Sequence, residues 1–368
     1  MNIAIIDADL VGRKQHRFPN LACMKISSYY KSLGNDVVLK LDYKDLELFD
    51  KVFISKVFTD TYIDENILNL PNVEYGGTGF FYDKARPLPD DIEHKMPDYH
   101  LYDEWINVQV SKGIKEKQLE YYLNYSIGFT TRGCIRRCSF CVNKNYKQCN
   151  LHSTIEEFLD KDRKYICLLD DNVFACKEWK QVFNNLNETG KRFQFKQGLD
   201  ERLLTDEKCE ILFNSKWIGD YIFAFDNIKD KNVIIEKLEL IRKYTHKRCK
   251  FYVFCGCNHL NPEQYDEEFW ERDINELFQR IEILAKYKCI PYIMKYKDYE
   301  LSPYRGTYIN VSAWCNQPNI FEKMTYNQFC EADNKRKGGR SATWRYYQKL
   351  LDDYIYMDKY FNIKFNNN

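Results

Sequence analysis

The chain has 368 residues, more than one ordinary domain holds, so we expect two domains and an extension. Its 55 Lys and Arg residues nearly balance its 54 Asp and Glu residues, and the net charge of +1 gives no argument for a nucleic-acid or membrane partner. No apolar run reaches the length of a membrane span, and the start, MNIAIIDADL, lacks the plan of a signal peptide. We therefore expect a cytoplasmic protein without membrane contact.

In the first part of the chain, four short apolar strands are expected, with a helix between the first and the second. Alternation of this kind predicts a parallel sheet in a small doubly wound α/β domain, which we place at residues 1–95. The expected strands are Met1 to Ile6, Asp36 to Leu41, Lys51 to Phe58 and Val73 to Phe81, and the expected helix is Leu21 to Leu33.

The fourth of these strands runs into a glycine-rich turn, Gly76-Gly77-Thr78-Gly79. Such turns can hold a phosphate when a helix follows them, but no helix is expected here, so a plain backbone bend is the favoured interpretation. The next segment contains Pro87, Pro89 and Pro97 among charged residues. We interpret residues 96–124 as a connector on the surface.

Six further apolar strands alternate with helices whose apolar residues recur every three or four positions. Six such units predict an open, partial (β/α)6 barrel of the TIM type at residues 125–303, followed by a helical extension at 304–368 that closes its open side. The expected strands are Ile127 to Thr131, Tyr165 to Leu169, Arg192 to Gln197, Trp217 to Phe225, Lys250 to Cys255 and Ile290 to Lys295.

Three of the fourteen cysteines lie within eight residues. Cys134, Cys138 and Cys141 have the spacing C-x3-C-x2-C, directly after the first barrel strand, in a polar turn that offers no core to fill. They are therefore expected to be metal ligands. Structural zinc takes four ligands and His152 stands alone nearby, whereas three thiolates on a cubane iron–sulfur cluster leave one iron open. The other cysteines are scattered as in a protein of a reducing compartment.

With Phe140 before the last cysteine, this stretch resembles the motif of the radical S-adenosylmethionine (SAM) superfamily. The resemblance implies that Cys134, Cys138 and Cys141 hold a [4Fe-4S] cluster, that SAM chelates the fourth iron, and that Phe140 lies near the adenine. It also implies reductive cleavage of SAM to a 5′-deoxyadenosyl radical, which abstracts hydrogen from a substrate that the sequence does not identify. The electron would come from an external donor of the flavodoxin or ferredoxin type.

The N-terminal domain is similar to the cobalamin-binding-like domain that precedes the barrel in one branch of this superfamily. Asp7 and Gly12 match the pattern D-x-H-x-x-G, but Asp9 takes the place of the histidine that would bind cobalt. Two interpretations stay open. Either the chain is a cobalamin-dependent methyltransferase of this superfamily, or the domain has kept the fold and uses its strand ends to position substrate.

Parallel barrels carry their sites at the carboxyl ends of the strands. The resemblance implies that Asp170 and Asn172 meet the SAM amino group, that Arg202 pairs with its carboxylate, and that Gln197 and Asp226 reach ribose hydroxyls or substrate. The alternative for each is a solvated residue or a helix cap at a strand end.

Cys255 and Cys257 at the fifth strand end have two interpretations, a hydrogen-atom donor or methyl acceptor, and a pair of ordinary core thiols. In the extension, the basic segment Asn334 to Arg340 reads NKRKGGR. It supports a rival of another class, a zinc-containing nucleic-acid-binding module without enzymatic activity, although a short basic cluster is more often a solvated face.

Overall fold

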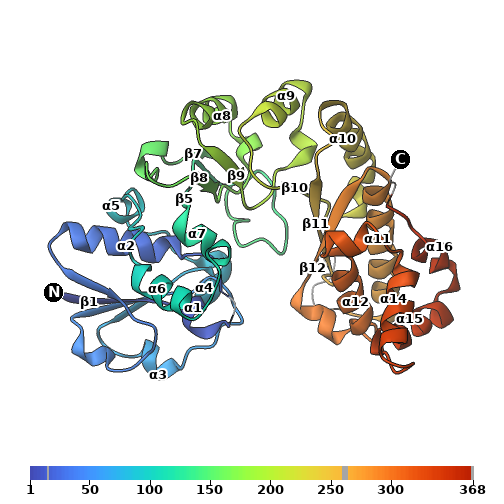
Figure 1. Cartoon of the computed structure of the whole chain (residues 1–368), viewed down its shortest axis with the longest axis horizontal. Coiled ribbons are helices and arrows are strands. Elements are labelled where there is room, and N and C mark those ends of the chain that lie inside the picture. The colour runs from blue at the N-terminus through green and yellow to red at the C-terminus, as the bar shows by residue number, and fades with distance from the viewer. Residues whose placement is uncertain (15, 259–263, 366–368) are drawn as a thin grey trace. The chain divides into compact units, whose positions relative to one another are not determined.

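The computed structural model describes residues 1–14, 16–258 and 264–365, and its ribbon is shown in Figure 1. The chain divides into two compact units, Met1–Lys196 and Gln197–Asn368. Both are mixtures of helices and parallel sheets, as predicted for an α/β protein. Within the described ranges, no helix is both long enough and apolar enough to cross a bilayer.

The first unit begins with a four-stranded parallel sheet in the order β2-β1-β3-β4. All four predicted strands are present, although each ends earlier than expected except β1. Neighbouring residues of a strand point to opposite faces, and the two central strands, which are covered on both faces, are buried along nearly their whole length. The strands are β1 (Asn2–Asp7), β2 (Asp36–Leu39), β3 (Lys51–Ser55) and β4 (Val73–Gly76).

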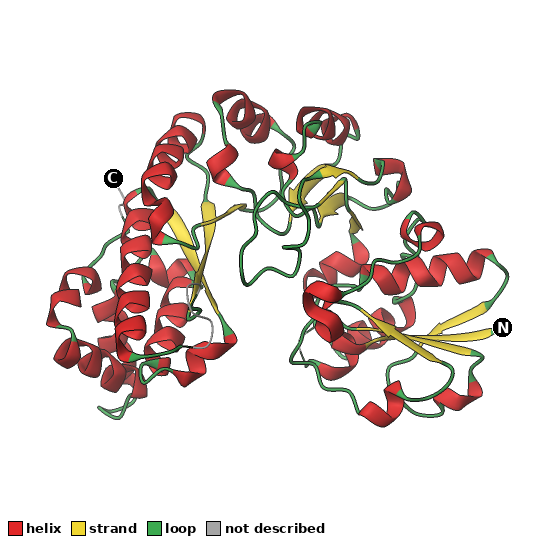
Figure 2. Ribbon diagram, turned by 180° about the vertical axis from the view of Figure 1, so that it is seen from behind, coloured by secondary structure: helices red, strands yellow, loops and turns green. Residues whose placement is uncertain are grey.

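Apolar side chains cover both faces of this sheet. Ile3 and Ile5 pack on one face with α2 (Leu21–Ser32), and Ala4 and Ile6 pack on the other. Figure 2 shows helices on both faces of the first four strands. This parallel sheet with helices beside it agrees with the predicted α/β class, and the doubly wound domain layout stays a prediction. The short helices beside the sheet are α1 (Ala8–Gly12), α3 (Glu65–Leu68) and α4 (Thr78–Phe81).

The expected surface connector contributes to the core of the first sheet. After α5 (Asp90–Glu93), the connector forms α6 (Asp103–Ser111) and α7 (Glu120–Leu123), and its apolar side chains join the cluster around α2. Tyr102, for example, is 2% exposed. The aromatic residues that the sequence offered as a surface segment are thus core residues, because they supply the apolar partner that α2 needs.

The first unit also holds a second parallel sheet, in the order β5-β8-β9. These strands are the first three expected for the barrel, with α8 (Trp179–Glu188) between the last two. A short antiparallel pair that the sequence did not predict, β6 with β7, follows β5. The bounds are β5 (Tyr125–Gly128), β6 (Thr131–Arg132), β7 (Asn150–Leu151), β8 (Tyr165–Leu168) and β9 (Arg192–Phe195).

The second unit is built on a three-stranded parallel sheet, β10-β11-β12. These are the last three predicted barrel strands, β10 (Tyr221–Ala224), β11 (Cys249–Cys255) and β12 (Cys289–Lys295). The six expected parallel strands are therefore all formed, three in each unit. Their closure into one barrel, and the domain boundaries drawn from it, stay predictions.

Long amphipathic helices cover the second sheet. In α11 (Glu267–Lys286) the buried residues Ile274, Leu277, Ile281 and Leu284 recur at helical spacing, as predicted, and this helix packs on β11 and β12. The helices of the extension follow, and the first of them, α12, packs on β12. The remaining helices are α9 (Asp206–Asn214), α10 (Lys231–Tyr244), α12 (Arg305–Cys315), α13 (Pro318–Phe321), α14 (Tyr326–Arg336), α15 (Ala342–Asp353) and α16 (Asp358–Phe361).

Candidate cysteine-loop site

The three motif cysteines lie on one loop that leaves the carboxyl end of β5 and returns through β7. Its ends are joined by the antiparallel pairing of Thr131 with Leu151 and of Arg132 with Asn150. We call residues 133–149, between these two strands, the cysteine loop. A loop whose ends are hydrogen-bonded to each other has a fixed base. The structure therefore places the cysteines where the sequence predicted them, at a strand end, on a base that the sequence did not reveal.

Asp170 follows Leu169 just beyond the carboxyl end of β8. It binds Thr130 and Thr131, the residues that lead into the cysteine loop. Its carboxylate accepts hydrogen bonds from the backbone N–H and the hydroxyl of both Thr130 and Thr131, at 2.5–3.0 Å. Burial raises the pKa of Asp170 to about 6, although the four donors oppose that shift. Its carboxylate is engaged within the chain, and its predicted contact with the SAM amino group stays a prediction.

Asp171 joins the two sides of the cysteine loop. One carboxylate oxygen accepts from the Gly133 N–H at 2.9 Å and the other from the Asn143 side-chain amide at 2.5 Å. Gly133 has a φ of +97°, and a Cβ there would lie 2.2 Å from the carbonyl oxygen of Gln148. Only glycine fits this position. The Asp170-Asp171 pair thus fixes the loop from the neighbouring strand.

Hydrogen-bond donors point at two of the cysteine sulfurs. The Cys134 sulfur lies 3.2 Å from the Arg136 backbone nitrogen and 3.3 Å from the Asn172 side-chain nitrogen, and the Cys141 sulfur lies 3.3 Å from the Asn143 backbone nitrogen. Such donors stabilise thiolates, and hydrogen bonds to cysteine sulfurs tune iron–sulfur clusters. Asn172, predicted as a SAM contact, therefore lies beside the first cysteine of the motif.

The cysteine loop fits the cluster that the motif implies. Cys134, Cys138 and Cys141 are half-buried and free of disulfides, and burial raises the pKa of the Cys141 thiol. Phe140 is half-buried between the last two cysteines. Among the described residues, no three Cys, His, Asp or Glu side chains converge on a point where a single metal ion would bind. Thiols with sulfur-directed donors and no carboxylate ligand suit iron–sulfur or other soft-metal chemistry.

The remaining predicted site residues, Gln197, Arg202 and Asp226, belong to the second unit. Gln197 is exposed. The Arg202 guanidinium is held by Asp200 at 2.8 Å and by Asp230 at 3.0 Å. These two contacts give Arg202 intramolecular partners, and its pairing with the carboxylate of SAM stays a prediction.

Asp226 follows Phe225 at the end of β10, where it is half-buried. Its carboxylate accepts from the Phe254 N–H at 3.1 Å, and burial raises its pKa to about 6 against the opposing charge of Arg280. Arg280, from α11, is 2% exposed and donates to the carbonyl oxygens of Phe225, Asp226 and Phe254 at 2.8–3.2 Å. A buried guanidinium thus fastens the carboxyl ends of β10 and β11.

Sequence reasoning missed Glu201, which is 1% exposed. One carboxyl oxygen accepts from the Ala224 N–H at 3.1 Å, and the other has no hydrogen-bond partner among the described atoms. Burial, with the charge of Asp200, raises its pKa to about 8. In the sequence Glu201 stands between two charged residues and looks solvated. The available signal was the apolar Leu199 before it and Leu203 after it, which indicate a buried turn.

Cys255 and Cys257 differ in their surroundings. Cys255 is 2% exposed, its sulfur lies 3.8 Å from the Met294 carbonyl oxygen, and burial raises its pKa well above the ordinary value. Cys257 is half-buried, and burial raises its pKa to about 11. A raised pKa favours the thiol form, which both interpretations require, so the choice between them stays a prediction.

The basic segment of the extension lies at the end of α14 and in the turn after it. Arg336 and Lys337 pair with Asp333 at 2.6 and 2.9 Å. Two of its positive charges are therefore offset by one carboxylate. Binding of nucleic acid by this segment stays a prediction.

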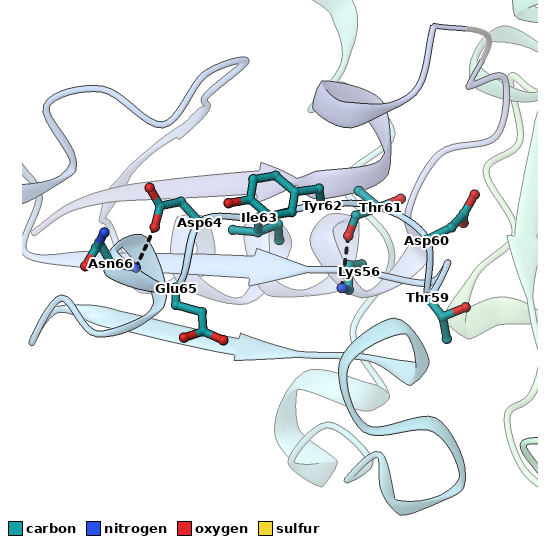
Figure 3. A pocket seen from close by; sticks show the side chains of 9 residues that line it. All are labelled: Lys56, Thr59, Asp60, Thr61, Tyr62, Ile63, Asp64, Glu65 and Asn66. Atoms are coloured by element: carbon teal, nitrogen blue, oxygen red, sulfur yellow. Dashed lines mark hydrogen bonds between the residues drawn. The ribbon is translucent and has the colours of Figure 1, made fainter.

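The carboxyl ends of β1 and β3 meet where the order of the first sheet reverses, the usual ligand position in such folds. Two open cavities lie there, of about 600 and 380 Å³, and both are lined by Asp60 and Thr61. Figure 3 shows the larger, lined also by Lys56 and by residues 62–66. Neither cavity is lined by a cysteine.

Asp9, which stands where the cobalamin pattern has its histidine, does not fit cobalt coordination. It is fully buried, and its two oxygens accept from the Val57 N–H at 2.7 Å and the Thr61 hydroxyl at 2.5 Å. The carboxylate therefore fastens α1 to the loop after β3. Asp9 therefore does not offer a ligand to the cobalt of cobalamin.

These contacts define a mixed α/β chain with parallel sheets and with a cysteine loop at a strand end. No protein family and no curated protein matches the sequence. Among solved structures, the chain is similar to the cobalamin-dependent S-adenosylmethionine radical enzyme OxsB. The structure of OxsB with aqua-cobalamin and S-adenosylmethionine matches at 11% identity and a TM-score of 0.35, and the apo structure at 12% and 0.37. Each match covers 99% of this chain but only 57% and 56% of OxsB.

Proposed function

We propose that the chain is a radical SAM enzyme that holds a [4Fe-4S] cluster on Cys134, Cys138 and Cys141. The observation that carries this proposal is the cysteine loop itself. It leaves the carboxyl end of a parallel strand, its base is closed by β6 and β7, and backbone and side-chain nitrogens point at two of its sulfurs. When bound, such a cluster supplies the electron that cleaves SAM reductively to a 5′-deoxyadenosyl radical.

The residues of the chain have separable roles in this proposal. Asp170 and Asp171 hold the backbone at the start of the cysteine loop against the end of β8. Asn172 donates a hydrogen bond to the Cys134 sulfur and orients it. Phe140 packs beside the adenine of SAM. These roles orient the ligands and limit the access of water to the site.

Strand ends of the second unit offer the remaining polar groups. We assign Arg202, Gln197 and Asp226 to SAM or substrate, with Asp226 held in place by its bond to the Phe254 N–H. Since Asp9 is engaged within the chain, the first domain positions substrate and does not ligate cobalt through this residue. The substrate is unassigned, and electrons come from a separate flavodoxin-type or ferredoxin-type donor.

The test is anaerobic reconstitution with iron and sulfide, followed by reduction in the presence of SAM. We expect about four irons per chain, as one cubane requires, and release of 5′-deoxyadenosine. Cys138→Ala should lose both. The matched control is Cys257→Ala, a half-buried cysteine outside the loop, which should keep its iron.

Three results would overturn the proposal. The first is equal iron content in wild type and Cys138→Ala, since it would separate the metal from the motif. The second is retention of zinc in place of iron, with salt-sensitive binding of an oligonucleotide, as expected of a nucleic-acid-binding module. The third is iron binding with no release of 5′-deoxyadenosine. Binding of cobalamin to the reconstituted chain would restore the methyltransferase alternative for the first domain.

A further inference from the structure

The segment after β4 contacts the cysteine loop at several points, among them a cation–π contact in which the Lys144 ammonium lies 5.7 Å from the centre of the Tyr82 ring. The Tyr82 hydroxyl donates to the carbonyl oxygen of Phe140. The Asp83 carboxylate lies 3.0 Å from the Lys144 ammonium, and the Asp83 carbonyl oxygen accepts from the Asn145 side chain at 2.7 Å. These contacts join residues about 60 positions apart in the sequence, all within the first unit.

The Tyr82 contact acts on one peptide group between two motif cysteines. That group consists of the Phe140 carbonyl and the Cys141 N–H. Tyr82 binds its oxygen, and the carbonyl oxygen of Cys138 accepts its N–H at 3.0 Å. A peptide group is planar and rigid, so fixing both of its ends fixes its orientation. The position of the Cys141 Cα, from which its side chain leaves the backbone, is fixed with it.

The backbone that presents Tyr82 is anchored on the first sheet. A Cβ at Gly77 would lie 2.3 Å from the Lys56 carbonyl oxygen, and the Gly79 N–H donates to that same oxygen at 2.9 Å. The glycine-rich turn thus packs against the end of β3, and a short helix, α4, follows it where none was predicted. This close approach explains the glycines without a phosphate.

Tyr82 itself adopts a backbone conformation that a bulky residue rarely takes, with φ of +49° and ψ of −119°. Outliers of this kind persist only where the surroundings hold them, and they occur most often at functional positions. Here the anchored glycine turn precedes Tyr82 in the chain, and the Tyr82 side chain contacts the cysteine loop.

We propose that Tyr82 and Asp83 are positioning residues that clamp the backbone of the cysteine loop and so restrict the movement of its thiols. The proposal rests on the function proposed above, since it assigns the clamp to the cluster ligands. Neither residue touches the cluster. Tyr82 acts through the Phe140 carbonyl, and Asp83 acts through Lys144 and Asn145.

The first experiment uses the full chain without metal, so that it does not depend on the cluster. Alkylation of each cysteine by iodoacetamide is followed by peptide mass spectrometry, with Cys257 as the internal reference. Loss of one neutral hydrogen bond shifts an opening equilibrium by roughly 2- to 10-fold. We therefore expect Tyr82→Phe to raise the alkylation rate of Cys141 by this factor, and Asp83→Asn to raise it by a smaller one.

The matched control is Tyr75→Phe, which removes a hydroxyl from β4 but leaves the Tyr75 ring packed on Phe80 and Phe81. It should alkylate like wild type. The second readout is the rate at which a chelator removes iron from the reconstituted chain, which should rise in Tyr82→Phe and not in Tyr75→Phe.

The outcomes separate the clamp from the cluster. If Cys141 reactivity rises in Tyr82→Phe while wild type binds no iron, the clamp stands and the proposed function fails. If wild type binds iron but Tyr82→Phe and Asp83→Asn match it in both alkylation and iron release, the clamp is wrong and the proposed function stands. Equal rises in Tyr82→Phe and Tyr75→Phe would also overturn the clamp.

Discussion

Replacing Glu201 with Gln should change how the stability of the second unit depends on pH. Burial raises the pKa of Glu201 to about 8 from its ordinary value of 4.5. Between these two values the folded chain binds more protons than the unfolded chain. The stability contributed by the protonated carboxyl is therefore complete below about pH 4.5 and is lost as the pH rises to about 8.

The size of the effect follows from the pKa difference. About 3.5 pH units at 1.36 kcal/mol each give roughly 5 kcal/mol in total, of which about 3 kcal/mol is lost by pH 7. Gln keeps an oxygen that can accept the Ala224 N–H but has no proton to release. In a unit of this size, 3 kcal/mol corresponds to roughly 6–12 °C in melting temperature. Glu201→Gln should therefore melt higher than wild type at neutral pH and close to it in acid.

The assay is differential scanning calorimetry of both chains over a series of pH values, with the transition of the second unit followed separately. Glu236→Gln is the control, because the Glu236 side chain is 69% exposed. Other carboxyls, Asp226 among them, titrate in both chains, so only the difference between the two curves is informative. Parallel curves for wild type and Glu201→Gln would refute the assignment of a raised pKa to Glu201.

Two further substitutions test the first unit. Asp170→Asn should lower the midpoint of urea unfolding, because its amide would face donors that now bind a carboxylate, at a cost on the order of 1–3 kcal/mol for each buried group left unpaired. Gly128→Ala should lower the melting temperature, because the new Cβ would lie 2.3 Å from the Phe158 ring, and overpacking of this kind costs about 1–3 kcal/mol.

Each has a matched control. Asp162 is exposed, so Asp162→Asn should unfold like wild type. Gly76 has no atom within 4 Å of an added Cβ, so Gly76→Ala should also melt like wild type. An Asp170→Asn chain as stable as its control would show that the four hydrogen bonds contribute nothing. A Gly128→Ala chain that melts with its control would show that the Phe158 ring moves aside without cost.

The strands could be predicted from the sequence because each is a short apolar run. Burial on both faces requires such a run in a parallel sheet, and β11 and β12 differ from the expected bounds by one residue each. The pairing of β6 with β7 could not be predicted in the same way. It involves two residues on each side, Thr131 and Arg132 with Asn150 and Leu151, and has no hydrophobic period.

The position of the three cysteines at a strand end was predictable from the sequence, but the contacts that support their loop were not. Cysteine spacing is local, so the motif is readable directly from the chain. The partners of Asp170 lie about 40 positions earlier, and Arg280 reaches carbonyls 26–55 positions away. Those contacts depend on which strands become neighbours. For the same reason the buried state of Glu201 was invisible within its charged surroundings.

The closed base of the cysteine loop has a consequence for how iron could be acquired. Bringing together the ends of the 17 residues between Arg132 and Asn150 costs about 2.5 kcal/mol of chain entropy. This entropy is already lost when the chain folds, because β6 and β7 pair. Under the function proposed above, cluster uptake would then need only local adjustment of the thiols, so a preassembled cofactor handed over by a carrier could be received by a chain that is already folded.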